Sequence, residues 1–305
     1  MKTKFKNILI TGGAGYVGTV LTELLLKEGY TVRVFDSISE MNLHPLPFGN
    51  SKKFEFVKGD IREKSDVKKA LKGMDAVIHL AGIVGYPACE KEPELSHQVN
   101  VIGTKNVMSA AKGELPILFA STTSVYGKIT DDICTEATAR NPLSRYGKQK
   151  VEAEDLVKKN KKFIIFRFTT GFGASIKMRF DTLPNDFTYK ALKEGKIVIY
   201  QKNFIRSFIY VKDMARAFLF GLEHFDTMNG EVYNVGNNDL NISKEELGLL
   251  VQKKTKCKLE FKEIGKDLEG RDYYVSFDKI AKTGYKTKMS IEDGVDELIN
   301  VISHL

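Results

Sequence analysis

A glycine-rich segment near the beginning of the chain constrains the fold more than any other feature. Residues 11–18 read TGGAGYVG, with an apolar run before them and an amphipathic run after them. This order predicts a strand, a tight turn and the N-terminus of a helix. Gly12, Gly15 and Gly18 suit a turn whose backbone closely approaches a pyrophosphate, which the helix N–H groups then face. For the glycines alone, an ordinary turn between strand and helix is the alternative interpretation.

The next strand-like run restricts which dinucleotide the chain can bind. Residues 31–35 (TVRVF) end at Asp36, 18 positions beyond Gly18. An acidic side chain there can accept hydrogen bonds from both hydroxyls of an adenosine ribose, and it repels a 2′-phosphate. Because Ser37 and not an arginine follows, the sequence predicts NAD as the bound cofactor in place of NADP.

Strand-like and helix-like runs alternate over the first 170 residues and alternate less regularly afterwards. We therefore expect an α/β protein, a Rossmann-type doubly wound parallel sheet with a smaller C-terminal α/β lobe. Residues 1–170 are assigned to an NAD-binding domain with the catalytic residues. Residues 171–305 are assigned mainly to a substrate-binding lobe, from which some segments can return to the first domain. Substrate is expected in the cleft between the two.

The predicted elements follow from these periodicities, and two helices open with the capping sequences Ser243-x-x-Glu246 and Ser290-x-x-Asp293. Residues 171–184 are expected to form a long loop. The expected strands are 5–10, 31–35, 54–57, 75–79, 116–120, 163–167, 197–200, 231–235 and 257–262, and the expected helices are 16–28, 63–71, 95–112, 145–159, 185–194, 212–223, 243–254 and 290–303.

Composition excludes several classes of function. The net charge of +8 comes from lysines spread along the chain, without the basic and aromatic pattern of a nucleic-acid site, so no nucleic-acid partner is expected. Without an apolar run of membrane-spanning length or a secretory leader, no membrane association is expected either. Cys89, Cys134 and Cys257 lack the spacing of a disulfide framework or a metal site. The sequence therefore predicts a cytoplasmic protein without a metal.

Two segments carry candidate chemistry. Tyr146 and Lys150 lie four residues apart at the start of an expected helix, and so on one helix face. An ammonium about 4 Å from a phenol could lower the phenol pKa by about 3 units, which would make Tyr146 a usable base. Thr122 and Ser124 follow the strand at 116–120 and are expected to contact the reacting oxygen and the substrate. A solvated helix face and a Ser/Thr turn are the alternative interpretations of these two segments.

In this order the motifs resemble those of the extended short-chain dehydrogenase/reductases, in the nucleotide-sugar epimerase and dehydratase branch, nearly from end to end. Further motifs that contribute are GDIR at 59–62, HLAG at 79–82 and Asn100. The resemblance implies Thr122, Tyr146 and Lys150 as catalytic residues. It also implies NAD contacts at Gly12, Gly15, Tyr16, Val17, Asp36, Asp60, Ile61, Leu80, Ala81, Gly82, Asn100, Tyr146 and Lys150.

The C-terminal half extends the resemblance to the substrate. Asn185, Arg206 and Arg271 match positions that bind the substrate diphosphate in that branch, and Ser124 is a further expected substrate contact. Forked guanidinium groups suit phosphates chemically. The implied substrate is a UDP- or GDP-linked sugar, and the implied assembly is a homodimer or a higher homo-oligomer.

Several positions depart from the branch. Thr123 and Ser124 replace the Asp-Glu pair of the 4,6-dehydratases, which argues against elimination of water, and Thr170 replaces a usual Asn. The segments 82–89 and 175–181 resemble a subgroup of GDP-heptose 4-dehydrogenases. We expect an NAD-dependent 4-epimerase. A 4-dehydrogenase that releases a keto sugar is the first alternative, and a catalytically silent NAD-binding regulator is the second.

Two residues near these motifs are assigned to structural roles. Cys89, in the segment 82–89, is expected to contribute to packing. His79, at the end of a strand, is expected to be a semi-buried histidine whose ring nitrogens have hydrogen-bond partners.

Overall fold

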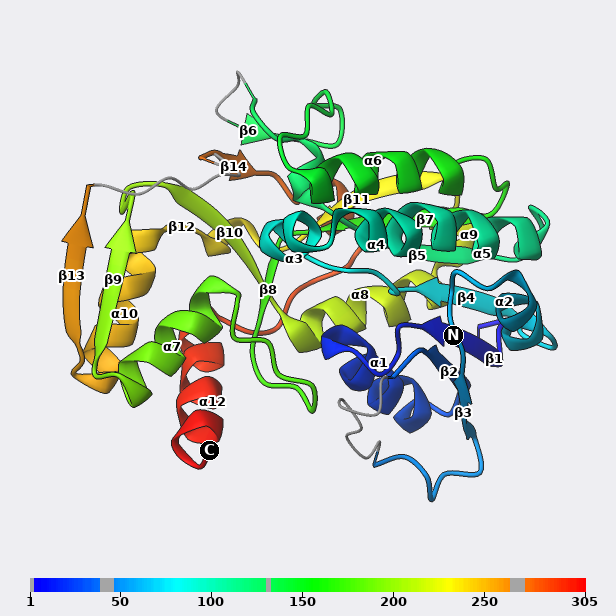
Figure 1. Ribbon diagram of the computed structural model, residues 1–305, viewed down its shortest axis with the longest axis horizontal. Helices are drawn as coiled ribbons and strands as arrows, with labels where there is room; N and C mark the ends of the chain where they lie inside the picture. Colours follow the sequence, from blue (N-terminus) through cyan, green and yellow to red (C-terminus); the bar gives the residue numbers. More distant parts are fainter. Residues whose placement is uncertain (1–2, 39–46, 130–132, 264–271) are drawn as a thin grey trace.

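The computed structural model describes residues 3–38, 47–129, 133–263 and 272–305. Its larger part is built on one parallel sheet with helices on both faces (Figure 1). The seven strands that form this sheet among the described residues are β1 (Asn7–Thr11), β2 (Thr31–Asp36), β3 (Phe54–Lys58), β4 (Ala76–His79), β5 (Ile117–Thr122), β7 (Phe163–Phe168) and β11 (Glu231–Val235). Their order across the sheet is β11-β7-β5-β4-β1-β2-β3, so the predicted doubly wound α/β fold is confirmed.

Alternating apolar side chains explain the two helix layers. Ile8 and Ile10 of β1 are buried in the same core as Leu21 and Leu25, whereas Leu9 lies in the core of the other face. The first layer contains α1 (Tyr16–Lys27) and α8 (Val211–Glu223), which pack on each other. The second contains α2 (Lys64–Leu71), α5 (Thr104–Ala111) and α6 (Arg145–Val157).

The long helix expected at 95–112 is divided. The chain forms α3 (Tyr86–Lys91), which was not predicted, then α4 (Pro93–His97), a π-helical turn η2 (Gln98–Gly103) and α5. A π-helical turn widens the backbone locally and often marks a functional position. At its end, a Cβ on Gly103 would lie 2.7 Å from Cγ2 of Ile61, so the close approach requires glycine there.

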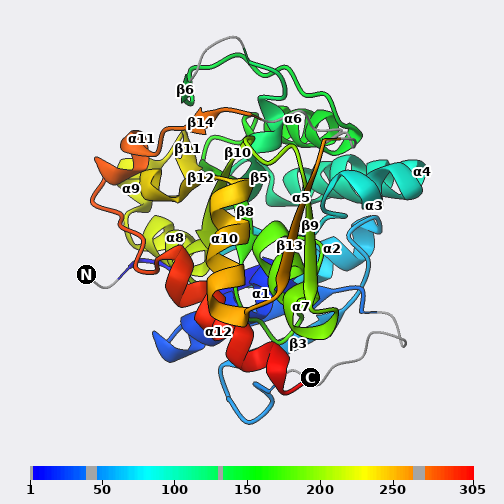
Figure 2. The same cartoon turned by 90° about the vertical axis from the view of Figure 1, so that its left-hand side faces the viewer.

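A second, smaller set of elements faces the viewer in Figure 2. It packs around its own core, with Phe172, Phe208, Leu247 and Val295 buried at its centre. The capping boxes predicted at Ser243 and Ser290 are both present. The strands of this part are β8 (Thr170–Phe172), β10 (Ile205–Tyr210) and β12 (Asn241–Ser243) in one sheet and β9 (Lys196–Tyr200) and β13 (Lys258–Lys262) in another, and its helices are α7 (Leu183–Lys193), α10 (Lys244–Thr255) and α12 (Ile291–Ser303).

The chain after residue 170 contributes to both parts of the molecule. β11 pairs in parallel with β7 at the edge of the large sheet, and α8 packs against α1. Within the described residues, none of the helices has the length and apolar character that a membrane span needs. The remaining short elements are β6 (Ile133–Cys134), β14 (Tyr274–Val275), η3 (Thr123–Val125), η4 (Asn238–Leu240), α9 (Phe225–Met228) and α11 (Asp278–Ala281).

Candidate active site

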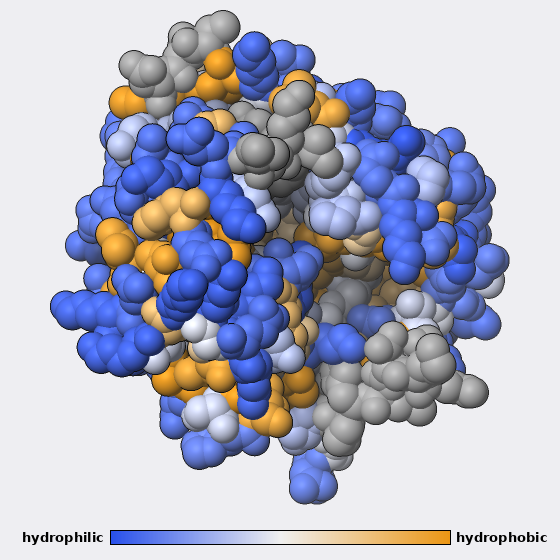
Figure 3. All heavy atoms as spheres, turned by 60° about the vertical axis from the view of Figure 1, so that its left-hand side comes forward, coloured by the Kyte–Doolittle hydropathy of each residue, from blue (hydrophilic) through white to orange (hydrophobic). Residues whose placement is uncertain are grey.

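A cleft of about 1110 Å³ runs along the carboxyl ends of the central strands, between the two parts of the molecule. Figure 3 shows the surface hollowed there. The volume exceeds that of most pockets for a single small molecule, which favours a large or double ligand. The glycine loop, the ends of β2, β4 and β5, and the beginning of α6 all contribute to its wall.

The glycine loop has the geometry of a phosphate cradle. Gly12 has a φ of +72°, and a Cβ on it would lie 2.6 Å from the amide nitrogen of Ala81. A Cβ on Gly18 would lie 2.5 Å from the carbonyl oxygen of Gly12. Among the described residues, no side chain caps α1 at Gly15, so its N-terminus is open to an anion. The loop therefore fits the pyrophosphate of a dinucleotide.

Asp36 ends β2 at one side of the cleft. Its carboxylate accepts hydrogen bonds from the backbone nitrogens of Ala14 at 3.0 Å and Ile38 at 3.3 Å, which orient it beside the glycine loop. This is the place where an adenosine ribose would lie if the pyrophosphate occupied the loop.

Asp60 and Ile61 lie in the same end of the cleft. Nε of Arg62 donates to Oδ2 of Asp60 at 2.9 Å, and this hydrogen bond holds the pKa of Asp60 below its usual value. Arg62 also lines the cleft and was not predicted to do so. The predicted adenine contacts of Asp60 and Ile61 remain predictions.

The segment after β4 forms the floor of the cleft, with Leu80, Ala81 and Gly82 in its wall. Asn100 was predicted to contact the cofactor, but it lies behind this wall. Its Oδ1 accepts from the backbone nitrogen of Ile83 at 2.8 Å, and its Nδ2 donates to the Ile83 carbonyl at 3.0 Å. We infer that Asn100 acts on the site through the backbone that it fixes.

Tyr146 and Lys150 project from the first two turns of α6 into the cleft. A Cβ on Gly147 would lie 2.7 Å from the carbonyl oxygen of Ser124, so α6 can approach the end of β5 this closely only with glycine there. Thr122, the last residue of β5, lines the same cleft, as does Ser124. Oγ1 of Thr122 donates to Oγ of Ser124 at 3.2 Å and accepts from its backbone nitrogen at 3.1 Å. The structure thus brings the predicted catalytic residues together.

Lys150 is a buried cation. Its Nζ donates to the carbonyl oxygen of Ala120 at 2.8 Å and lies 4.7 Å from the centre of the Phe119 ring and 6.0 Å from that of Tyr146. Burial lowers the pKa of Lys150 from 10.5 to about 8, against smaller opposing effects of Cys89 and Glu154. Lys150 therefore begins to lose its proton only slightly above neutral pH.

A buried ion pair anchors α6 to the sheet. The carboxylate of Glu154 accepts from Nε and Nη2 of Arg167, on β7, at 2.9 and 2.7 Å and from Oγ of Ser121 at 2.6 Å. Burial alone would raise the pKa of Glu154, but the hydrogen bonds and charge of Arg167, together with Ser121 and Lys158, outweigh it and hold this pKa below the usual value. Nη1 of Arg167 also donates to the Tyr126 hydroxyl at 2.9 Å.

The structural roles expected for His79 and Cys89 agree with their surroundings, except that His79 is fully buried and not semi-buried. Both ring nitrogens of His79 have partners, at 2.7 Å from Oγ1 of Thr11 and 3.0 Å from Oγ1 of Thr104. Burial, assisted by Lys150, lowers the pKa of His79 to about 3, so the ring is neutral. Cys89 is buried, with its Sγ 3.4 Å from the Ile83 carbonyl.

The expected substrate residues divide into three cases. Arg206, on β10, is buried and lines the cleft, and its Nη1 donates to the Ile205 carbonyl at 3.0 Å. Asn185 is buried behind the cleft wall, where its Nδ2 donates to the carbonyl oxygen of Arg179 at 2.7 Å and its Oδ1 accepts from the Gly173 nitrogen at 3.0 Å. Arg271 lies outside the described residues.

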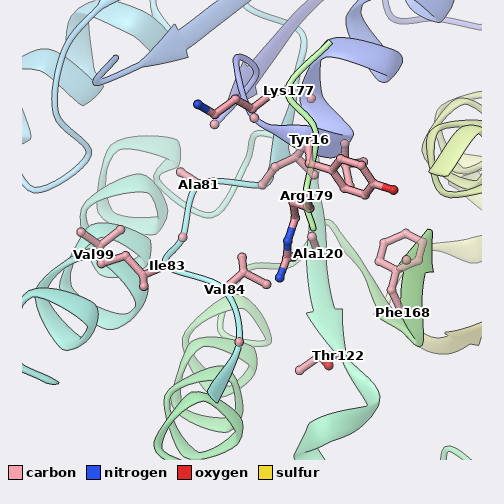
Figure 4. Close-up of a pocket in the computed structure, with 18 of the residues that line it drawn as sticks. Tyr16, Ala81, Ile83, Val84, Val99, Ala120, Thr122, Phe168, Lys177 and Arg179 are labelled. Atoms are coloured by element: carbon pink, nitrogen blue, oxygen red, sulfur yellow. The ribbon is translucent and has the colours of Figure 1, made fainter. Parts of the chain in front are cut away.

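Sequence reasoning did not assign Arg179, Asp181 and Lys177 to the site, yet all three line the cleft. Figure 4 shows Arg179 extending from beside Tyr16 toward Val84. The resemblance of 175–181 to a subgroup motif was the signal that could have found them. Tyr16 is held in place by a hydrogen bond from its hydroxyl to the carbonyl oxygen of Gly173 at 2.8 Å.

The chain is similar in sequence and in structure to known nucleotide-sugar enzymes. A model of the NAD dependent epimerase/dehydratase family matches residues 8–236. A UDP-N-acetyl-alpha-D-glucosaminuronate decarboxylase of Bacillus cytotoxicus is 32% identical over 256 residues, covering 77% of this chain and 76% of that protein. UDP-glucose 4-epimerase 1 of Oryza sativa subsp. japonica is 26% identical, covering 96% of this chain and 92% of that protein. The structure of UDP-glucuronic acid 4-epimerase from Bacillus cereus, in complex with UDP-glucuronic acid and NAD, is 25% identical, has a TM-score of 0.86, and matches over 98% of this chain and 99% of that one.

Proposed function

The chain belongs to the NAD dependent epimerase/dehydratase family, and from this premise we propose that it is a nucleotide-sugar 4-epimerase. It is an enzyme of the extended short-chain dehydrogenase/reductase type, and NAD is its cofactor. The proposal adds that the oxidised carbon is C4 of a nucleotide-diphospho-sugar. It also adds that the hydride returns to the opposite face of the same carbon.

The convergence of Thr122, Tyr146 and Lys150 on the cleft of the glycine loop carries this proposal. NAD bound along the glycine loop supplies the hydride acceptor for the alcohol carbon. Tyr146 removes the proton of the C4 hydroxyl and gives it back when the sugar is reduced again. Thr122 turns its hydroxyl from Ser124 to the reacting oxygen, and the ammonium of Lys150 favours the phenolate.

The substrate diphosphate would lie at the other end of the cleft, toward Arg206. A buried guanidinium in a cleft wall suits a phosphate because it provides several donors in a fixed plane. A second phosphate contact from Arg271 remains a prediction. The relatives named for UDP-sugars favour UDP over GDP as the nucleotide, and a homodimer is our expectation for the assembly.

One experiment tests the reaction. The purified protein is given UDP-, GDP- and CDP-sugars singly, and the sugar products and NADH are measured. An inverted C4 centre without net NADH is the expected outcome. Accumulation of NADH with a keto product would favour the 4-dehydrogenase, toward which the segments 82–89 and 175–181 point.

The tyrosine provides the matched variant. Tyr146→Phe removes the base and keeps the ring, so we expect kcat to fall by about 100-fold or more with NAD still bound. NAD binding is measured by calorimetry beside turnover. Turnover at the wild-type rate in this variant would refute the catalytic role, and absence of turnover with every sugar nucleotide would favour the silent NAD-binding regulator.

A further inference from the structure

The segment between β8 and α7 brings an ion pair into the cleft. Arg179 and Asp181 both line the cleft together with Tyr146. Nε and Nη2 of Arg179 donate to the two carboxylate oxygens of Asp181 at 2.9 and 2.7 Å. This forked arrangement fixes the plane of the guanidinium as well as its distance from the carboxylate.

The backbone that carries Arg179 is fixed from three sides. The carbonyl oxygen of Arg179 accepts from Asn185, the Tyr16 hydroxyl holds the carbonyl of Gly173, and the backbone nitrogen of Ala174 donates to Glu297 at 3.0 Å. The side chain of Arg179 is 27% exposed. Its charge therefore has a defined place and does not sample the solvent as a surface arginine does.

The guanidinium is directed toward the catalytic end of the cleft. Nη2 of Arg179 lies 3.7 Å from the position that a Cβ on Gly85 would take. In Figure 4 the side chain extends toward Val84 and Ala120, and the carbonyl oxygen of Ala120 is the one that holds Nζ of Lys150. Arg179 thus lies within electrostatic reach of Tyr146, the residue proposed to transfer the proton.

We propose that Arg179 is a second fixed cation that favours the Tyr146 phenolate, and that Asp181 sets how much of this charge the phenol experiences. This inference rests on the proposed function, in which Tyr146 must lose its proton. Arg179 is then a positioning residue that acts through Tyr146. Asp181 weakens the field of Arg179 because opposite charges at this distance partly cancel.

The pKa values of Lys150 and Arg179 explain why a second cation near Tyr146 is useful. Because the pKa of Lys150 is about 8, its ammonium is no longer fully protonated in mildly alkaline solution, whereas an arginine remains charged. Burial lowers the pKa of Arg179, but the hydrogen bonds and charge of Asp181, with smaller contributions of Tyr146 and Tyr16, raise it above its usual value.

The other titratable and charged groups around the N-terminal end of α6 differ in how they affect the charge near Tyr146. His79, on β4, is neutral because its pKa is about 3, and burial raises the pKa of the Cys89 thiol. Arg145 pairs with Glu90 of α3 at 3.4 Å, at the surface. The described groups to be considered in a titration are Cys89, Glu90, His79, Arg145, Lys150, Glu154, Lys177, Arg179 and Asp181.

The ionisation of Tyr146 can be followed without substrate. The NAD-bound protein is titrated with base while phenolate absorbance is recorded, and the Tyr146→Phe titration is subtracted. We expect Arg179→Gln to raise the apparent pKa of Tyr146 by about half a unit to one unit, and Asp181→Asn to lower it by a similar amount. Arg179→Lys keeps the charge and is expected to stay near the wild-type value.

Arg62→Gln is the matched control, since Arg62 lines the same cleft and pairs with Asp60 in a similar way, but at the adenine end. It is expected to leave the pKa of Tyr146 unchanged. The inference is overturned if Arg179→Gln and Asp181→Asn leave this pKa unchanged or move it in the same direction. It is equally overturned if Arg179→Gln only weakens sugar-nucleotide binding. None of these titrations requires turnover, so their failure would leave the 4-epimerase proposal to its own test.

Discussion

At the scale of single residues, Lys150 shows that the proposed chemistry has a cost in stability. The unfolded chain would hold this ammonium at its ordinary pKa of 10.5, whereas burial lowers the folded-state pKa to about 8. Between these two values the unfolded chain binds more protons, so stability rises with pH. The cost, about 3 kcal/mol, is fully present below pH 8 and is relieved as the pH rises toward 10.5.

Replacement of Lys150 by Met should therefore stabilise the fold while it removes activity. At pH 7 we expect a gain of about 2 kcal/mol in the free energy of unfolding, because the Ala120 carbonyl loses its hydrogen-bond donor and this offsets part of the relief. Urea denaturation without added NAD, at pH 7 and at pH 9.5, measures the effect. The gain should shrink at the higher pH. A variant less stable than the wild type at pH 7 would contradict this explanation.

Some residues of the site could be predicted from the sequence, and others could not. The spacing of Tyr146 and Lys150, and the glycines of the first turn, indicate their roles because neighbours along a helix or turn are neighbours in space. No spacing along a helix or turn marks Arg179. Its segment is held in the cleft by Asn185, which binds the Arg179 carbonyl, and by Tyr16, which binds the Gly173 carbonyl from a distant part of the chain.

At the scale of elements, α6 acts as the platform of the site, and its position depends on Glu154 and Arg167. Lys150 and Glu154 are one helical turn apart, and they bind the successive β5 residues Ala120 and Ser121. These two contacts fix the register of α6 on β5, and with it the place of Tyr146 relative to Thr122.

Glu154→Gln tests this platform. The change leaves the buried Arg167 guanidinium without its carboxylate, and we expect a loss of about 3–5 kcal/mol in the free energy of unfolding. Asp155→Asn, one position along the same helix, is the control, because the side chain of Asp155 is 51% exposed and its ion pair with Arg140 lies at the surface. That variant should stay within about 1 kcal/mol of the wild type by urea denaturation. Equal effects of the two changes would show that the buried pair does not hold α6.

Elements could be predicted where a local pattern exists and were missed where burial depends on distant partners. The apolar run that includes Ile8, Leu9 and Ile10 predicts β1, and Ser290 predicts the start of α12. β10 was not predicted, because its first residues include Arg206 and Ser207, polar side chains that are buried only where they meet the cleft and β12.

At the scale of the whole molecule, the order of the chain differs from its arrangement in space. β11 and α8 follow residue 170 but complete the larger part. The ring of Phe166, on β7, lies 5.4 Å from that of Phe218 and 6.4 Å from that of Tyr233, and the Tyr126 hydroxyl donates to Oδ1 of Asn234 at 2.6 Å. No local pattern in 231–235 identifies the strand that it pairs with, since parallel pairing joins distant segments.

This arrangement predicts that the first 170 residues do not fold alone. A fragment ending at residue 170 would leave β7 as an open edge and expose the rings that α8 and β11 cover. We expect urea denaturation of this fragment, followed by far-ultraviolet circular dichroism, to lack the cooperative transition of the full chain. A fragment that instead unfolds cooperatively near the midpoint of the full chain would show that residues 1–170 form an independent domain. In that case β11 and α8 would add to a unit that is already stable, and the cleft would be formed by docking of two separately folded parts.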